Sequence, residues 1–400
     1  MAWRTSASSM SGRRTMIVLQ KTVQPKLFLR TLTQGTGGGD MVMTSGRLQA
    51  LMKAEMSFLH GKYNIITVEK VLQSKTPHKV ARIIQKELPA RFATRLMEIE
   101  EVSDWRSIPS LFEMHSMLIE SFYNLRLVHL DEENMQPFID VIKDLRSRHR
   151  RMLQLLAQAA NELTAQEVML PNEVHAWITT FLQSRIGTEM LTAHFVQLLE
   201  KPDGQGIVDL KCDPLEICQK AIDQVRSNAL ASYNKKEVPE IILRCKRQDI
   251  RFPFLSTYLQ SMLNELLKNS VTATVLLRRK LRDTPQGFRR QGIRGGDIEV
   301  TVTADHDQIG IQISDGAGGV SFAESEKVWD YTYSTLPDHM QSNFEETTLF
   351  GPGLGLPLCR LYANYLKGSF DLMSVPGVGT DAYLFFNRLD PTGTASVDCE

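Results

Sequence analysis

The chain has 400 residues, of which 42% are apolar and 23% are charged, a composition typical of folded globular proteins. Its length favours two domains over one. The 46 basic residues equal the 46 acidic residues in number, so net charge gives no reason to expect binding to nucleic acid or to an anionic membrane surface. No apolar run approaches the ~20 residues that cross a bilayer, and we therefore do not expect an integral membrane protein.

The first 39 residues differ from the remainder because they contain six basic residues and no Asp or Glu. A segment rich in Arg, Ser and Thr and free of acidic residues is typical of an organelle transit peptide, and a solvated basic tail is the alternative. The glycine-rich run 35–39 would then be a flexible joint before the folded part. We assign residues 1–40 to this transit peptide and joint.

From about Ser45 to Leu199 the apolar residues have helical spacing, and the sequence predicts long helices over 108–128 and 135–163. In the second of these, His149 falls on the apolar face. A lone histidine there is more often a hydrogen-bonded core residue than a functional group. We expect a helical bundle of the four-helix type over residues 41–203. The residues Glu200–Gly204 interrupt the helical pattern and are the predicted linker between the two domains.

After the linker, helical and strand-like segments alternate. Helical patterns occur near 215–233, 255–281 and 357–366, and strand patterns occur at 240–245, 298–304, 308–314, 370–374 and 382–386. The turn residues Pro376–Gly379 predict a hairpin between the last two strands. This mixture predicts an α/β sandwich over residues 204–390, with helices on one face of a mixed sheet and a short tail at 391–400. The predicted fold class is therefore α+β.

Three polar residues in one predicted helix share a face. Glu265, Lys268 and Asn269 stand at positions i, i+3 and i+4. A carboxylate can orient a nucleophile or accept its proton, and an amide oxygen is a hard ligand suited to Mg²⁺. Many exposed helix faces carry such residues, so this pattern alone is weak.

Two glycine-rich segments strengthen the evidence that these polar residues have a function. Asp315 directly follows a predicted strand and precedes Gly316-Ala317-Gly318-Gly319, which offers a fixed hydrogen-bond acceptor beside a backbone that a planar ligand can approach. Gly351–Leu356 opens onto a predicted helix, and such a loop presents backbone amides and the positive end of the helix dipole to phosphates. The Walker sequence is absent, and the position does not match a Rossmann fingerprint.

The ordered motifs ExxKN, DGxGG and GxGxGL, followed by Gly379-Thr380, resemble the Bergerat ATP-binding fold of gyrase, heat-shock chaperone, histidine kinase and mismatch-repair ATPases. Within that group the chain is most similar to the mitochondrial pyruvate dehydrogenase kinase and branched-chain 2-oxoacid dehydrogenase kinase family. The resemblance covers roughly residues 45–390. One segment that carries it is Gly353–Ala363, which resembles the family's glycine box and the helix that follows. The others are Leu88–Arg91, Arg146–His149, Ser184–Ile186 with His194, and the lid-like Tyr331–Thr335.

The resemblance implies roles for individual residues. Glu265 would be the catalytic base that orients the substrate serine, His149 would reach towards it from the bundle, and Asn269 would bind Mg²⁺. Asp315 would accept the adenine amino group. The nucleotide site as a whole would comprise Glu265, Leu266, Leu267, Lys268, Asn269, Ser270, Val271, Thr272, Asp315, Gly319, Ser334, Thr335, Gly351, Pro352, Gly353, Leu354, Gly355, Leu356 and Thr380.

Some residues depart from the family pattern. The chain has Ser270-Val271-Thr272 where an Arg usually follows the Asn, and it has Pro352 where an aromatic residue is common. The loop from Arg278 to Gly296 is unusually basic and is either a solvated loop or a docking surface for an acidic partner. The short tail lacks the Asp-Trp of many pyruvate-type members, which bears on dimerisation and lipoyl-domain docking.

The resemblance thus implies a serine kinase of the mitochondrial matrix that uses ATP and Mg²⁺ and inactivates the decarboxylase component of the pyruvate dehydrogenase complex. It also implies a homodimer and recruitment by a lipoyl domain. The branched-chain complex is the alternative substrate. A Bergerat-type ATPase or a histidine kinase is the alternative from another class, although His149 is followed by Arg150-Arg151 and lacks the acidic residue and Pro typical of a phosphoacceptor histidine.

Overall fold

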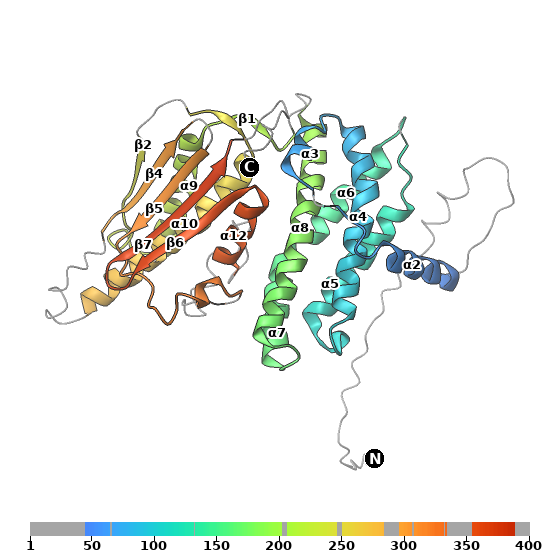
Figure 1. Cartoon of the computed structure of the whole chain (residues 1–400), viewed down its shortest axis with the longest axis horizontal. Helices are drawn as coiled ribbons and strands as arrows, with labels where there is room; N and C mark the ends of the chain where they lie inside the picture. The colour runs from blue at the N-terminus through green and yellow to red at the C-terminus, as the bar shows by residue number, and fades with distance from the viewer. Residues whose placement is uncertain are drawn as a thin grey trace, which may run out of the picture. The chain divides into compact units, whose positions relative to one another are not determined.

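A computed structural model gives the architecture (Figure 1). It describes residues 45–64, 66–131, 133–201, 206–245, 250–283, 296–305, 308–331, 333 and 354–388. The predicted transit peptide and joint, most of the linker, the core of the basic loop and the tail lie outside the described residues. Contacts divide the chain after Met52, within α2 (Ser45–Leu59), and all other elements belong to the unit that begins at Lys53.

The first part of this unit is helical. Its helices α4 and α7 each pack against both α5 and α8, which gives the bundle that the sequence predicts. Four of the helices carry proline in the first turn, where no backbone N–H is needed for the helix. The helices are α3 (Val68–Leu72), α4 (Pro77–Glu100), α5 (Pro109–Leu127), α6 (Gln136–Arg148), α7 (Met152–Ala165) and α8 (Pro171–Glu200), with short 3₁₀ turns η1 (Trp105–Ser107) and η2 (His149–Arg151).

The stretch 135–163 differs from its prediction as one helix. It is divided at η2, where His149 and Arg148 both contact the hydroxyl of Ser121 on α5, at 3.0 Å and 2.9 Å. A 3₁₀ turn has about three residues per turn, so one tightened turn leaves the apolar periodicity almost unchanged. The sequence pattern therefore could not show this break, which places His149 in a turn.

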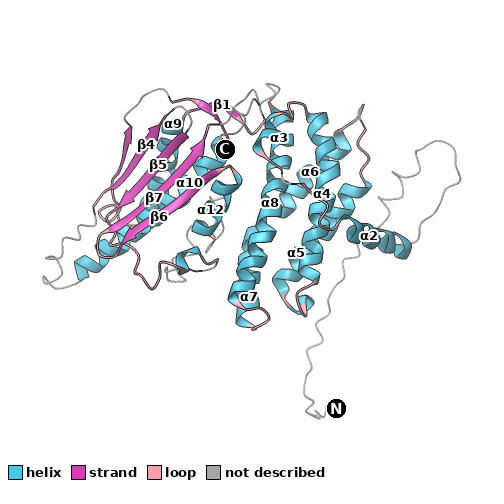
Figure 2. Ribbon diagram, in the orientation of Figure 1, coloured by secondary structure: helices cyan, strands magenta, loops and turns pink. Residues whose placement is uncertain are grey.

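The second part contains a five-stranded mixed sheet in the order β2-β4-β5-β7-β6. β2 runs parallel to β4 and the other pairs are antiparallel. Alternate residues such as Val300, Ile311 and Leu384 are buried. The helices α9, α10 and α12 pack against the sheet (Figure 2). The bounds are β2 (Ile241–Cys245), β4 (Ile298–Ala304), β5 (Gln308–Asp315), β6 (Gly368–Val375), β7 (Gly379–Asn387), α9 (Pro214–Ser232), α10 (Ser256–Asp283) and α12 (Gly355–Tyr365).

This arrangement confirms the predicted α+β fold, including the mixed sheet and the hairpin between β6 and β7. The sequence did not predict the small antiparallel sheet of β1 (Asp209–Cys212) and β3 (Phe252–Phe254), because three or four residues are too few for a periodic pattern. A short 3₁₀ turn, η4 (Lys327–Trp329), follows the glycine-rich segment after β5.

Among the described helices, none has the length and apolar character required to cross a membrane.

Candidate functional site

Helix α10 carries the ExxKN motif in its central turns. Glu265 is buried, with 4% of its surface exposed, and its Oε2 accepts a hydrogen bond from Lys268 Nζ at 2.7 Å. Asn269 is half-buried, and its side chain makes no hydrogen bond to any described residue. One face of α10 therefore presents an ion-paired carboxylate and, one turn later, an amide that is available to a ligand.

Helix α12 begins directly over Glu265. A Cβ atom at Gly355 would overlap Oε1 of Glu265, so a larger residue here would displace the carboxylate. The close approach brings the end of the predicted glycine box against the carboxylate. The first turn of α12 has backbone N–H groups without partners in the helix and carries the positive end of the helix dipole. The structure thus joins two motifs that lie 90 residues apart in the sequence.

Asp315 ends β5 and is held by three donors. Its Oδ2 accepts from the Ser270 hydroxyl at 2.8 Å, its Oδ1 accepts from the Ala317 backbone N–H at 3.0 Å, and the Thr380 backbone also donates to the carboxylate. Burial raises the pKa of Asp315, and these hydrogen bonds oppose the rise. The carboxylate is therefore fixed in place and retains lone pairs for a further donor.

Two glycines allow the segment after β5 to fold against the β6–β7 turn. Gly319 has a φ of +67°, and a Cβ atom there would overlap the carbonyl oxygen of Val375. A Cβ atom at Gly379 would overlap the carbonyl oxygen of Asp315. Because Thr380 pairs with Asp315 across β5 and β7, the structure brings Asp315, Gly319 and Thr380 together as the sequence suggests.

The other predicted nucleotide-binding residues divide into three groups. Ser270 contacts Asp315, whereas the buried side chains of Leu266, Leu267, Val271 and Thr272 lie in the interior of the domain. Leu354 is buried directly before α12, and Gly355 and Leu356 form its first turn. Ser334, Thr335, Gly351, Pro352 and Gly353 lie outside the described residues.

His149 is buried in the helical part, where its Nε2 lies 3.0 Å from the Ser121 hydroxyl. Within the described residues it makes no hydrogen bond to Glu265, whose carboxylate is bonded to Lys268. Burial, followed by the positive charges of Arg95, Arg185 and Arg148, holds the pKa of His149 well below its ordinary value. The structure therefore does not join the two residues expected to act together, and the catalytic role of His149 stays a prediction.

Sequence reasoning missed several contacts at this site. Ser270 was expected to follow the metal ligand, but its bond to Asp315 joins α10 to the sheet. Tyr331, the first residue of the lid-like segment, accepts a hydrogen bond from Thr179 at 3.2 Å, and its ring lies 4.8 Å from that of His175, both on α8. These contacts join distant segments, so no local pattern could reveal them.

Two family models match the chain, one over each part. The model for "mitochondrial branched-chain alpha-ketoacid dehydrogenase kinase" matches residues 64–214, and the model for "histidine kinase-, DNA gyrase B-, and HSP90-like ATPase" matches residues 255–390. The second match contains α10, Asp315, α12 and Thr380.

Curated relatives match most of the chain in one alignment. The mitochondrial pyruvate dehydrogenase kinase of Arabidopsis thaliana is 29% identical over 323 residues, covering 77% of this chain and 84% of that protein. Isozyme 4 of this kinase from Ictidomys tridecemlineatus and from Homo sapiens is 29% identical in each case, covering 76% of this chain and 76% of the relative. Over most of its length the chain is thus similar to the mitochondrial pyruvate and branched-chain 2-oxoacid dehydrogenase kinases.

The similarity to these kinases agrees with the distribution of the motifs. The ATPase model covers the elements that hold the carboxylates and the glycine-dependent close approaches, and the helical part falls under a model specific to dehydrogenase kinases. The ATPase model matches residues 255–390 and does not extend over the helical part. The helical part therefore distinguishes this chain from the wider group of ATPases.

We expect Gly379→Ala to weaken nucleotide binding by at least about tenfold, because the added methyl group displaces the Asp315 backbone that places the carboxylate. Titration with a fluorescent ADP analogue measures the dissociation constant. Gly296→Ala is the matched control, since a Cβ atom at Gly296 meets nothing within 4 Å. Equal affinity in both variants would contradict this account of the close approach.

The neutral His149 predicts a specific pH dependence of stability. Below its ordinary pKa of 6.5 the unfolded chain binds a proton that the folded chain does not bind. Stability is therefore lost as the pH falls below about 6.5 towards the lowered pKa, by at most about 1.4 kcal/mol per pH unit for this group. Urea unfolding at pH 7.5 and 5.5 should show a smaller loss for His149→Gln than for the wild type.

His129→Gln is the control for this measurement, because the His129 side chain is exposed. Its pH dependence should equal that of the wild type. A wild-type dependence that persists in His149→Gln would show that the buried imidazole is not its source.

Proposed function

We propose that this chain is a mitochondrial protein-serine kinase that phosphorylates the decarboxylase component of the pyruvate dehydrogenase complex and thereby inactivates it. One observation carries the proposal: Glu265, ion-paired and buried on α10, lies against the first glycine of α12 in a chain whose relatives are pyruvate dehydrogenase kinases. This places a proton acceptor beside a helix N-terminus suited to phosphate groups.

Phosphoryl transfer depends mainly on positioning and on neutralisation of charge. The Glu265 carboxylate would accept a hydrogen bond from the substrate serine and take its proton as the serine oxygen bonds to the γ-phosphorus of ATP. The bond from that phosphorus to the bridging oxygen breaks, and ADP leaves. Lys268 holds the carboxylate in place through its 2.7 Å bond, which leaves the other oxygen facing α12.

The adenine would bind at the opposite end of the site. Asp315 is held by Ser270, Ala317 and Thr380, and it would accept a hydrogen bond from the exocyclic amino group. Gly319 allows the backbone to lie close to the ring. Along the rest of the nucleotide we propose Ser334 and Thr335, with Gly351–Leu356 at the phosphates.

The donor set fits Mg²⁺ as the resident metal. This ion prefers a few protein oxygens together with phosphate oxygens and water, and the Asn269 amide makes no hydrogen bond to a described residue that would compete. Asn269 would hold the metal, one turn from Glu265. When bound, Mg²⁺ neutralises charge on the phosphates.

A pyruvate-type substrate is favoured by the names of the curated relatives, whereas the helical part matches a model named for the branched-chain kinase. The branched-chain decarboxylase is therefore the second candidate. A phosphohistidine relay is not supported, because His149 is buried and lies 3.0 Å from the Ser121 hydroxyl.

We further propose a location in the mitochondrial matrix, recruitment by the lipoyl domain of the acyltransferase core, and a homodimer. Exposed apolar side chains on the paired strands β6 and β7, Met373 and Phe385, support association through the sheet. The proposed partners are proteins of the dehydrogenase complex, with no role for nucleic acid.

Labelled ATP and Mg²⁺ should transfer phosphate to serine of the purified pyruvate decarboxylase component. Glu265→Gln should lower the transfer rate by at least about a hundredfold while ADP binding persists, because the amide cannot accept the proton. Glu216→Gln is the matched control, since it removes a Glu–Lys pair exposed on α9. Labelling of the branched-chain component alone would favour the second candidate, and Glu265-dependent hydrolysis without labelling would contradict a protein kinase.

Asn269→Ala should raise the Mg²⁺ concentration for half-maximal transfer by about tenfold or more, because one oxygen ligand is lost. The affinity for metal-free ADP should change little. Glu216→Gln should leave the Mg²⁺ dependence at its wild-type value. An unchanged Mg²⁺ dependence in Asn269→Ala would place the metal elsewhere.

A further inference from the structure

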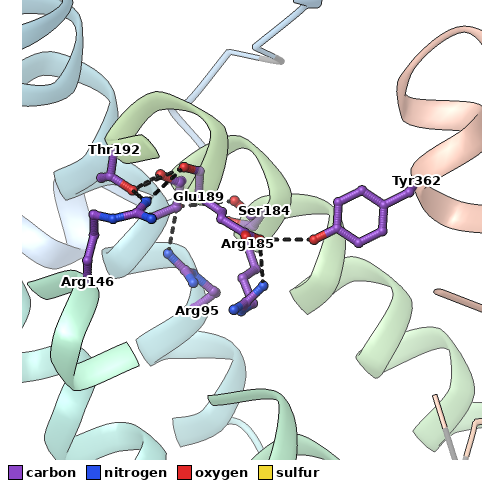
Figure 3. Close-up of polar contacts among 8 residues, drawn as sticks. Arg95, Arg146, Ser184, Arg185, Glu189, Thr192 and Tyr362 are labelled. Atoms are coloured by element: carbon purple, nitrogen blue, oxygen red, sulfur yellow. Dashed lines mark hydrogen bonds and ion pairs between the residues drawn. The ribbon is translucent and has the colours of Figure 1, made fainter. Parts of the chain in front are cut away.

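A largely buried ion pair on α8 receives a hydrogen bond from α12 (Figure 3). Arg185 Nη1 lies 3.0 Å from Glu189 Oε2, one helical turn further along α8. The Tyr362 hydroxyl donates to the same oxygen at 2.9 Å. The Tyr362 side chain is 1% exposed, and those of Arg185 and Glu189 are 13% and 18% exposed. One carboxylate thus joins the helical part to the helix that starts over Glu265.

Each partner keeps the protonation state that this contact needs. Burial lowers the pKa of Arg185, but Glu189, Tyr362 and Tyr258 together outweigh this effect, and the pKa of Arg185 is raised. Burial raises the pKa of Tyr362 well above its ordinary value, so the hydroxyl remains a donor at physiological pH. The Glu189 backbone is also fixed, since its carbonyl accepts from Arg146 and Thr192 (Figure 3).

Tyr362 ends a row of residues on α12 that packs against α10. Gly355 lies on Glu265, Cys359 Sγ is 4.0 Å from the Met262 carbonyl, and the Tyr362 ring is 5.5 Å from that of Tyr258. These α12 residues stand at i, i+4 and i+7 and so share one face of the helix. A shift of Tyr362 would therefore move the same row of α12 residues that places Gly355 against Glu265.

We propose that Arg185, Glu189 and Tyr362 are positioning residues that hold α12 against α10 and thereby set the N-terminal turn of α12 relative to Glu265. Through them α8 of the helical part controls the phosphate end of the nucleotide site. The inference deepens the proposed kinase function and rests on it for the catalytic consequence. Nucleotide affinity tests it separately from phosphate transfer.

Tyr362→Phe removes only the hydroxyl. We expect it to raise both KM for ATP and Kd for ADP by about five- to tenfold, with kcat changed less than twofold, because the phosphate-binding turn is less well placed before chemistry begins. Tyr365→Phe is the matched control on the same helix. It removes a tyrosine hydroxyl that donates to the Ile66 carbonyl at 2.6 Å, outside the row that contacts α10. It should leave KM and Kd unchanged.

A second variant tests whether Tyr362 acts through the ion pair. The double substitution Arg185→Met with Glu189→Met replaces the pair by apolar side chains of similar size, which avoids leaving an unpaired buried charge. We expect the same rise in KM and Kd. Addition of Tyr362→Phe to this double variant should have no further effect, since the residues act as one unit.

These measurements distinguish a positioning role of Tyr362 from a general effect on the stability of the protein. If Tyr362→Phe and Tyr365→Phe shift KM equally, or if both only lower the melting temperature, the proposal is overturned. Additive effects of Tyr362→Phe and the double substitution would also overturn it. If the wild type transfers no phosphate to a decarboxylase component, the kinase function fails, whereas the ADP affinities of the same variants still decide the positioning role. If Tyr362→Phe does not fold, the double substitution Arg185→Met with Glu189→Met tests the proposal in its place.

Discussion

The contact between Glu265 and Gly355 is the constraint on which the site depends. A buried carboxylate is tolerated in a protein interior when it is paired, and here Lys268 supplies the pair within the same helix. The absence of a side chain at Gly355 then lets α12 begin directly over the carboxylate. This single close approach combines a proton acceptor with a helix N-terminus, and neither motif could provide that combination alone.

At the opposite end of the site, the sheet positions Asp315 in a similar way, through hydrogen bonds and glycines that allow a close approach. Asp315 is held at the end of β5 by donors from α10, from the following loop and from β7. Gly379 and Gly319 allow the backbones to approach closely enough for this. The site is thus bounded by two fixed carboxylates, one suited to the chemistry and one suited to recognition of a base. Both depend on α10, which links the two ends through Glu265 and Ser270.

The helical part contributes through contacts between its long helix α8 and the sheet-containing part. Tyr331 contacts Thr179 and His175 near the start of α8, and Tyr362 contacts Glu189 further along it. In the sequence, Tyr331 and Tyr362 stand at either end of the stretch that contains the predicted lid-like segment and the predicted phosphate-binding loop Gly351–Leu356. The helical part and the ATPase-like part of this chain match two separate family models, and these contacts provide a physical route by which one part can influence the other.

The sequence by itself determined the fold class and the strands of the mixed sheet, and it located the motifs that we predict to form the nucleotide site. Period-two and period-3.6 patterns report which face of an element is buried, and short glycine motifs report local backbone needs. The tertiary structure alone decided that Gly355 lies on Glu265, that Ser270 holds Asp315, and that Tyr362 contacts Glu189. It also placed His149 in a 3₁₀ turn bonded to Ser121, away from its expected contact. Such contacts join residues many positions apart, so their geometry depends on packing between elements, which no local periodicity encodes.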